Sequence, residues 1–213
     1  MQITRFVCNM VEENTYLVYD SDGEAALIDC GAFHQEEKQA ISQHIREHNL
    51  HLKRLLNTHG HFDHIFGADY IYKEYGVKIQ LADAERTTFE SSVSQMCTFM
   101  HRLLPLELPP AGTYLHDGDL IEVGSLRFEV IATPGHTPGG ICFYDQTHGV
   151  LFSGDSLFKG SIGRTDLPGG DFQALVQALK TRILSLPDQV TVLPGHGPAT
   201  TIGEERRNNP YLR

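Results

Sequence analysis

The sequence lacks the features that direct a protein to a membrane or to a nucleic acid. No apolar run approaches the roughly 18 residues that a membrane-spanning helix needs, and 40% of the residues are hydrophobic against 21% charged. The formal net charge is −10, and Lys and Arg form no cluster dense enough to follow a phosphate backbone. We therefore expect neither a membrane nor a nucleic acid as a partner.

A disulfide framework and a secretion signal are also missing. The cysteines contain no C-x-x-C pair and are widely spaced, which favours reduced thiols at Cys8, Cys30, Cys97 and Cys142. The opening residues lack the basic start, the long apolar middle and the small-residue cleavage site of a secretory signal. We expect a cytoplasmic protein whose 213 residues form one domain, residues 1–213.

One short stretch is unusually rich in metal-binding side chains. Three imidazoles and a carboxylate fall within six residues, at His59, His61, Asp63 and His64. On an extended segment His59 and His61 face the same side, whereas Asp63 and His64 begin the helical pattern that follows, so the donors divide between two neighbouring points. Imidazole and carboxylate are the usual ligands of zinc and its first-row neighbours. The stretch therefore predicts a metal site.

Hydrophobic periodicity predicts an α/β protein in which groups of strands alternate with helices. Strands are expected at 2–7, 15–19, 25–29, 52–56, 77–81, 120–123, 126–131, 141–144, 150–152 and 190–193. Helices are expected at 36–48, 65–75 and 172–183. Residues 83–110 have no clean period and suggest helical pieces and loop, a candidate for substrate contact or a plain surface excursion. Two mostly antiparallel sheets packed face to face, with helices outside, fit this layered order.

Three further candidates follow predicted strand ends and are flanked by glycine: His136, Asp155 and His196. With these residues the sequence resembles the metallo-β-lactamase superfamily, whose motif run is H-x-H-x-D-H, followed by a distant His, an Asp and a last His. The resemblance spans nearly the whole chain. It implies that family's αββα sandwich, with the site along one edge of the two sheets.

The same resemblance implies two divalent metal ions, with zinc as the first choice and iron or manganese as alternatives. It assigns one ion to His59, His61 and His136 and the other to Asp63, His64 and His196, with Asp155 bridging both. Asp63 and Asp155 are then the carboxylates at the catalytic centre. Asp29, in a stretch that matches the superfamily's first motif, would orient the ligands from behind.

Within the superfamily, the chain looks most like the short relatives of glyoxalase II, the hydroxyacylglutathione hydrolases. The similarity lies in residues 154–166 and 201–212. It implies a thioesterase that cleaves a hydroxyacyl-thiol such as S-lactoylglutathione by a metal-bound hydroxide. The chain departs from full-length glyoxalase II because it lacks the C-terminal helical extension that supplies part of the glutathione site. Asp166 also stands where a Tyr is expected, so thioester hydrolysis is better supported than glutathione as the carrier.

Two cations follow Asp155 on a segment expected to line the cleft, Lys159 and Arg164. Arg164 matches a basic position of the family. One interpretation is a clamp for the carboxylate of an anionic small-molecule thioester, because a guanidinium can meet a carboxylate with two hydrogen bonds. The other is that both cations balance acidic neighbours such as Asp166 and Asp171.

Other functions stay open. The resemblance extends to persulfide dioxygenases, which hold a single iron with two His and one Asp, here His59, His136 and Asp155. The complete set of seven ligands favours hydrolysis over this alternative. A non-catalytic, metal-stabilised interaction module is a third hypothesis, whereas a β-lactamase is disfavoured by the missing secretion signal. The acyl group, the thiol and the oligomeric state remain undetermined.

Overall fold

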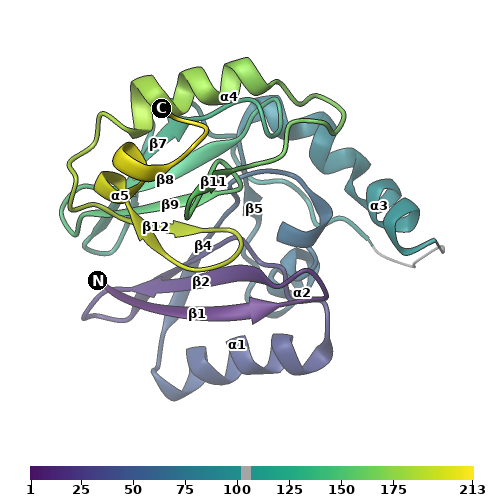
Figure 1. Ribbon diagram of the computed structural model, residues 1–213. Coiled ribbons are helices and arrows are strands. Elements are labelled where there is room, and N and C mark those ends of the chain that lie inside the picture. Colours follow the sequence, from purple (N-terminus) through teal and green to yellow (C-terminus); the bar gives the residue numbers. More distant parts are fainter. Residues whose placement is uncertain (102–106) are drawn as a thin grey trace.

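The computed structural model describes residues 1–101 and 107–213. Two sheets pack face to face, and helices cover their outer faces (Figure 1). The strand order is β1-β2-β3-β4-β5 in one sheet and β13-β12-β9-β8-β7-β6 in the other. The αββα architecture predicted from the sequence is thereby confirmed.

The first sheet contains both antiparallel and parallel pairs. Its strands are β1 (Gln2–Cys8), β2 (Glu13–Tyr19), β3 (Glu24–Ile28), β4 (His51–Leu56) and β5 (Ile79–Gln80). The first three form the predicted antiparallel meander, but β3 pairs with β4 in parallel, and so does β4 with β5. Parallel neighbours need a crossover, and the helices α1 (Gln35–Glu47) and α2 (Ala68–Tyr75) provide it.

The second sheet is mostly antiparallel. Its strands are β6 (Leu120–Val123), β7 (Leu126–Ala132), β8 (Ile141–Asp145), β9 (Val150–Gly154), β12 (Thr191–Pro194) and β13 (Thr200–Thr201). The strands predicted at 120–123 and 126–131 form the hairpin β6-β7, and those predicted at 141–144 and 150–152 form the hairpin β8-β9. Among the described strands of this sheet, only β9 and β12 form a parallel pair. The chain between them passes through α4 (Phe172–Ala178) and a π-helical turn (Leu179–Ile183).

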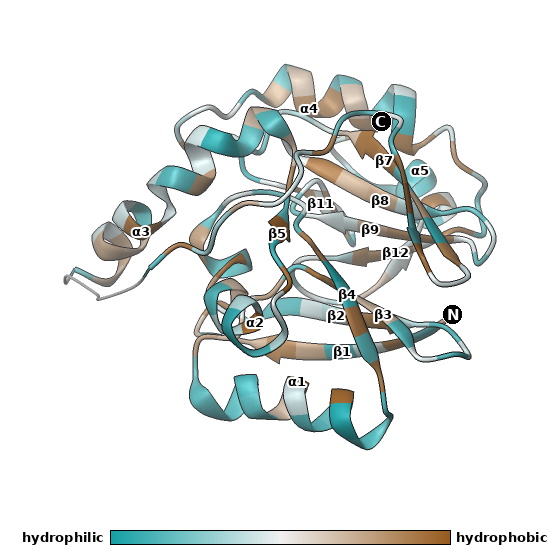
Figure 2. Ribbon diagram, turned by 180° about the vertical axis from the view of Figure 1, so that it is seen from behind, coloured by the Kyte–Doolittle hydropathy of each residue, from teal (hydrophilic) through white to brown (hydrophobic). Residues whose placement is uncertain are grey.

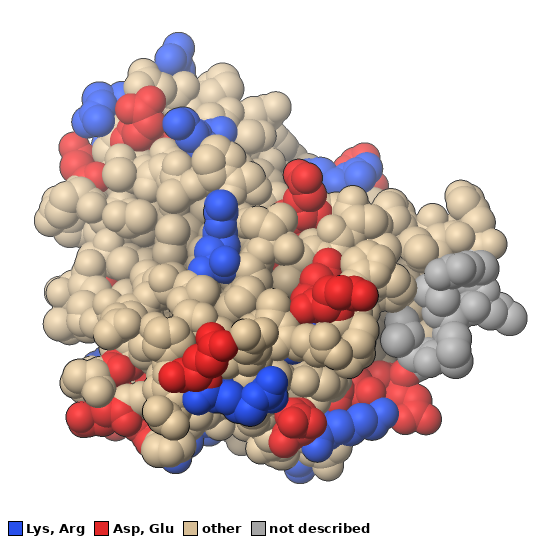
Figure 3. All heavy atoms as spheres, turned by 90° about the horizontal axis from the view of Figure 1, so that it is seen from below, with Lys and Arg blue, Asp and Glu red and all other residues tan. Residues whose placement is uncertain are grey.

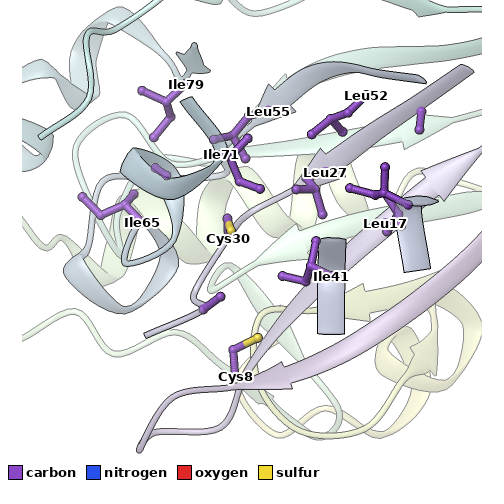
Figure 4. Close-up of a cluster of buried hydrophobic side chains, with 14 of the residues drawn as sticks. Cys8, Leu17, Leu27, Cys30, Ile41, Leu52, Leu55, Ile65, Ile71 and Ile79 are labelled. Carbon is purple, nitrogen blue, oxygen red and sulfur yellow. The ribbon is translucent and has the colours of Figure 1, made fainter. Parts of the chain in front are cut away.

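Side-chain alternation along the strands creates three apolar layers. On β2, Leu17 packs toward α1 and α2, whereas Tyr16 and Val18 pack between the sheets. Figure 4 shows the first of these layers, in which Leu17 lies with Ile41 of α1 and other aliphatic side chains. Strands such as β2 are therefore buried on both faces, while α1 is largely hydrophilic in Figure 2. Burial of both sheet faces is what holds the strand ends in fixed positions.

Two helix ends are set by capping residues. α2 ends at Gly76, which has the left-handed backbone (φ 69°) that glycine adopts without strain. α4 begins after Asp171, whose carboxylate accepts a hydrogen bond from the backbone N–H of Ala174 at 2.9 Å. A short ribbon, β10 (Leu157–Phe158) with β11 (Ser161–Ile162), and the helix α5 (Ile202–Asn208) were not predicted.

The segment at 83–110 differs from its prediction. After a single 3-10 turn, one continuous helix, α3 (Arg86–Met100), stands where helical pieces were expected. Its buried residues Phe89, Ser92 and Met96 follow helical spacing, but the Ser in the middle hid the apolar period. Residues 102–106 of this prediction lie outside the described residues.

Among the described residues, none of the helices is both long and apolar enough to cross a bilayer. On the face seen from below in Figure 3, Lys and Arg side chains are interspersed with Asp and Glu.

Candidate metal centre

All seven predicted ligands gather at one edge of the sandwich. His59, His61, Asp63 and His64 lie between β4 and α2, the last two in a 3-10 turn (Phe62–His64). His136 follows β7, Asp155 follows β9 and His196 follows β12. Ends of strands from both sheets meet here, so side chains far apart in the chain can face one point. Their candidate ligand atoms form overlapping groups within 4.8 Å of one another.

The first group contains only imidazoles, His59, His61 and His136. Nδ1 of His61 lies 3.0 Å from Nε2 of His136. Nε2 of His59 is buried and has no hydrogen-bond partner in the described parts of the chain. Because buried polar atoms in folded proteins almost always have a partner, this unpaired nitrogen indicates that a ligand is expected at this point.

The second group joins a carboxylate to two imidazoles, Asp63, His64 and His196. Oδ2 of Asp63 lies 3.2 Å from Nε2 of His196 and 3.7 Å from Nε2 of His64. Gly195, the neighbour of His196, allows this approach, because a Cβ at that position would collide with His64 and with the carboxylate of Asp155. Nε2 of His64 likewise has no hydrogen-bond partner among the residues described.

Asp155 lies between the two groups. Its Oδ1 is 3.3 Å from Nε2 of His64, and its Oδ2 is 3.6 Å from Nε2 of both His136 and His196. The carboxylate thus faces an imidazole of the first group and both imidazoles of the second. This is the geometry that a bridging role requires.

The opposite ring nitrogens determine which atoms remain free for a cation. Nδ1 of His64 donates to Asp29 Oδ2 at 2.9 Å, Nδ1 of His136 to the carbonyl of Arg164 at 2.7 Å, and Nδ1 of His196 to the carbonyl of Val11 at 3.0 Å. A neutral ring that donates from Nδ1 keeps a lone pair on Nε2. These free nitrogens and the carboxylate oxygens are a donor set that suits zinc, iron or manganese.

Burial and charge shift the pKa values of the two groups in opposite directions. Burial lowers the pKa of His59 well below its ordinary value and that of His61 to about 4, so both imidazoles are neutral and ready to bind a cation. Burial also opposes the charged form of His64, but Asp155, Asp29 and Asp63 outweigh it and raise its pKa. Asp155 itself has a pKa lowered well below the ordinary value, because His64 outweighs its burial.

Asp29, the carboxylate predicted to orient the ligands, lies directly behind His64. Its backbone is left-handed (φ 57°), a conformation that Asp tolerates better than most residues. The carboxylate accepts from the backbone N–H and the hydroxyl of Thr58, both at 2.8 Å, as well as from His64. A carboxylate held by three donors can fix the orientation of an imidazole ligand.

Sequence reasoning missed a second buried carboxyl group, Glu13. Its Oε1 lies 3.9 Å from Nδ1 of His64, and its Oε2 accepts from the hydroxyl of Thr15 and the backbone N–H of Gly31. Burial raises the pKa of Glu13 well above its ordinary value. The Nδ1 proton of His64 already points at Asp29, so Glu13, Asp29 and His64 do not form a further cation site. Polar residues at the start of an apolar strand were the available signal.

A cavity of about 1120 Å³ opens over the two groups. The cluster contributes His61, Asp63, His136, Asp155 and His196 to its lining. The helix α3 forms another wall, mainly with hydroxyl side chains from Thr87, Thr88, Ser91, Ser94 and Thr98. The described part of the segment at 83–110 therefore lies where a substrate would bind.

The two predicted substrate-binding cations differ in their positions. Arg164 lines the cavity, but its guanidinium donates two hydrogen bonds of 2.8 Å to the carboxylate of Asp166, and both side chains are exposed. Lys159 is exposed and is not among the described residues that line the cavity. The pairing with Asp166 agrees with the interpretation in which Arg164 balances an acidic neighbour. Contact of either cation with substrate stays a prediction.

Known proteins with similar sequences include a named hydrolase. The model of the metallo-β-lactamase superfamily matches residues 10–196. The hydroxyacylglutathione hydrolase GloC of Haemophilus influenzae is 38% identical over 202 residues, which are 94% of this chain and 93% of that protein.

Solved structures agree with the sequence relatives. The BLEG-1 B3 metallo-β-lactamase has a TM-score of 0.90 and 34% identity, and covers 99% of each chain. TTHA1623 in a di-iron-bound form has a TM-score of 0.85 and 36% identity, over 98% of this chain and 100% of that one. ETHE1 from Myxococcus xanthus has a TM-score of 0.80 and 28% identity, over 99% of this chain and 84% of that one. With its fold, its clustered ligands and these relatives, the chain belongs to the metallo-β-lactamase superfamily of metal-binding hydrolases.

Proposed function

We propose that the chain is a metal-dependent thioesterase that cleaves a hydroxyacyl-thiol such as S-lactoylglutathione. The observation that carries the proposal is the pair of donor groups that share Asp155 at the base of a cavity of about 1120 Å³. The likeness to GloC supports the same substrate class. We expect the reaction in the cytoplasm, on a small anionic thioester.

Seven residues would hold two divalent cations. We assign the first to His59, His61 and His136, the second to Asp63, His64 and His196, and the bridging position to Asp155. When bound, two such neighbouring cations make a water acidic enough to act as a nucleophile near neutral pH and stabilise negative charge on a carbonyl oxygen. Zinc is our first choice, with iron or manganese as alternatives, and the di-iron form of TTHA1623 illustrates that the metal varies.

The chain's own residues favour a thioester over an amide. Apart from the cluster and Arg164, the described side chains that line the cavity are hydroxyl, amide or apolar, as at Ser91, Gln95 and Leu167. None of these is an acid that could protonate a leaving amine. A thiol has a free pKa of about 8.5, so a thiolate can leave without such help. Asp63 and Asp155 line the cavity and would carry the negative charge that balances the cations.

A mononuclear iron dioxygenase is the alternative. It would use His59, His136 and Asp155, and Nε2 of His136 lies 3.6 Å from the carboxylate of Asp155. The likeness to ETHE1 is consistent with this alternative. The complete second group favours the hydrolase, because a single-iron site has no use for Asp63, His64 and His196.

Metal analysis beside activity assays tests the proposal. The protein would be purified without added metal, its metal content measured, and three reactions compared: cleavage of S-lactoylglutathione, oxygen uptake with glutathione persulfide, and hydrolysis of a cephalosporin. We expect two ions per chain and thioester cleavage as the fastest reaction. Oxygen uptake with one iron per chain would establish the dioxygenase instead. A metal-loaded protein inactive on all three substrates would favour a non-catalytic module.

A further inference from the structure

The loop that carries His196 is held by a strand of the other sheet. His196 follows β12 of the second sheet, and its loop is held there by the backbone N–H of Gly195, which donates to the carbonyl of Gly154 at 2.8 Å. Its other backbone contacts come from the start of β2 in the first sheet. Asn14, on β2, donates its backbone N–H to the carbonyl of Gly195 at 2.7 Å. Its side-chain amide donates to the carbonyl of Pro194 at 3.0 Å and to that of Gly197 at 2.9 Å.

These contacts surround one imidazole. Pro194 and Gly197 lie on either side of His196 in the chain, so both N–H bonds of a single amide bracket this ligand. The ring is fixed from the same region, because its Nδ1 donates to the carbonyl of Val11 at 3.0 Å. Asn14 is only 2% exposed, so water cannot readily replace it as the donor.

The start of β2 is itself anchored on its opposite face. Neighbouring side chains of a strand point to opposite sides of the sheet. Glu13 therefore turns away from the His196 loop, and its carboxyl group accepts from the backbone N–H of Gly31 at 3.1 Å. Asn14 thus reaches across to the second sheet from a fixed base.

We propose that Asn14 is a positioning residue that fixes His196 and, through it, the second cation. This rests on the two-cation site of the proposed function. Without the amide, the carbonyl of Gly197 loses its Asn14 donor and that of Pro194 keeps the hydroxyl of Tyr16 at 2.8 Å. The Gly197 side of the loop can then move away from Asp63. Loss of a supporting partner of this kind costs about ten- to hundredfold in metal affinity. The first group does not depend on Asn14, because Nδ1 of His136 donates to the carbonyl of Arg164. The affinity of the first group for its cation should therefore not change.

Variants of Asn14 can be compared with a matched buried asparagine. Asn209 is 0% exposed, and its amide donates to the carbonyl of Ser161 at 3.0 Å and to Glu205 at 2.8 Å, away from the cluster. Zinc affinities of both sites would be measured with a competing chelator, beside the melting temperature. We expect Asn14→Ala to weaken the second ion about ten- to hundredfold and leave the first unchanged. Asn209→Ala should lower the melting temperature but keep both affinities.

Asn14→Ser, which keeps one donor, should give an intermediate affinity and serves if Asn14→Ala does not fold. Unchanged affinity for the second ion in a folded Asn14 variant would overturn the proposal, and so would an equal loss in Asn209→Ala. The NMR signals of the His196 ring in metal-free protein test the positioning role of Asn14 separately from the proposed two-cation function. They should shift in the Asn14 variants but not in Asn209→Ala, whether the wild type binds one ion or two. Unshifted signals would refute the positioning role even if two ions bind.

Discussion

The two ligand groups of the centre are built differently. Each group combines two residues of the short stretch with one imidazole from a distant part of the chain, His136 in the first and His196 in the second. The first contains only imidazoles, and the pKa values of His59 and His61 are lowered, mainly by burial. The second contains a carboxylate, and its imidazoles, His64 and His196, have raised pKa values because neighbouring carboxylates outweigh their burial. The first group therefore offers neutral rings to a cation, whereas the second must release protons to bind one.

Loss of Asp155 should have the largest effect, because it removes the residue that the two groups share. We expect Asp155→Ala to weaken both cations and to lower thioester turnover by more than about 100-fold, beyond the loss from a supporting residue. Metal content after dialysis and the turnover rate measure this. A variant that keeps two ions and the wild-type rate would mean that Asp155 bridges nothing.

Single-ligand variants should separate the groups. His196→Ala should chiefly empty the second site, and His136→Ala, its matched counterpart, should chiefly empty the first. The metal content of each purified variant is the measurement, and about one ion per chain is the expected value in both. If either variant lost both ions to the same extent, the groups would not bind independently, and the comparison would be wrong.

Acidification should release the second cation before the first. The pKa values of His64 and His196 are raised above the ordinary 6.5, so protons compete with the cation there as soon as the pH falls below neutral. The pKa of His61 is lowered to about 4, so that ring stays neutral at lower pH. We expect metal content to fall from two ions to one as the pH drops from about 7 to about 5, with turnover falling in parallel. A flat rate and an unchanged metal content over this range would contradict it.

The smallest effect is expected at Arg164, which belongs to neither group. If its guanidinium holds a substrate carboxylate, Arg164→Ala should raise KM for an anionic thioester about tenfold and leave a neutral one unchanged. Asp166→Ala, which frees the guanidinium, should lower the same KM. Equal changes for both substrates would show that Arg164 orders the loop through its pair with Asp166.

Short-range pattern was enough to predict the layered fold and the ligand candidates. Strand alternation and capping residues such as Asp171 and Gly76 act within a few residues, so they can be read without the structure. The same holds for the clustered His59, His61, Asp63 and His64, which the structure brings together with the three distant candidates. α3 was read poorly because a buried Ser92 interrupts its apolar face, so the local pattern is ambiguous there.

The sequence by itself determined which residues could bind a cation and which segments would form strands and helices, because composition and period express these properties locally. Only the tertiary structure decided that Asn14 meets a loop about 180 residues away, that Glu13 lies behind His64, and that the Arg164 guanidinium pairs with Asp166. The physical reason is that such contacts depend on the register and packing of two sheets. These bring groups together that share no pattern along the chain.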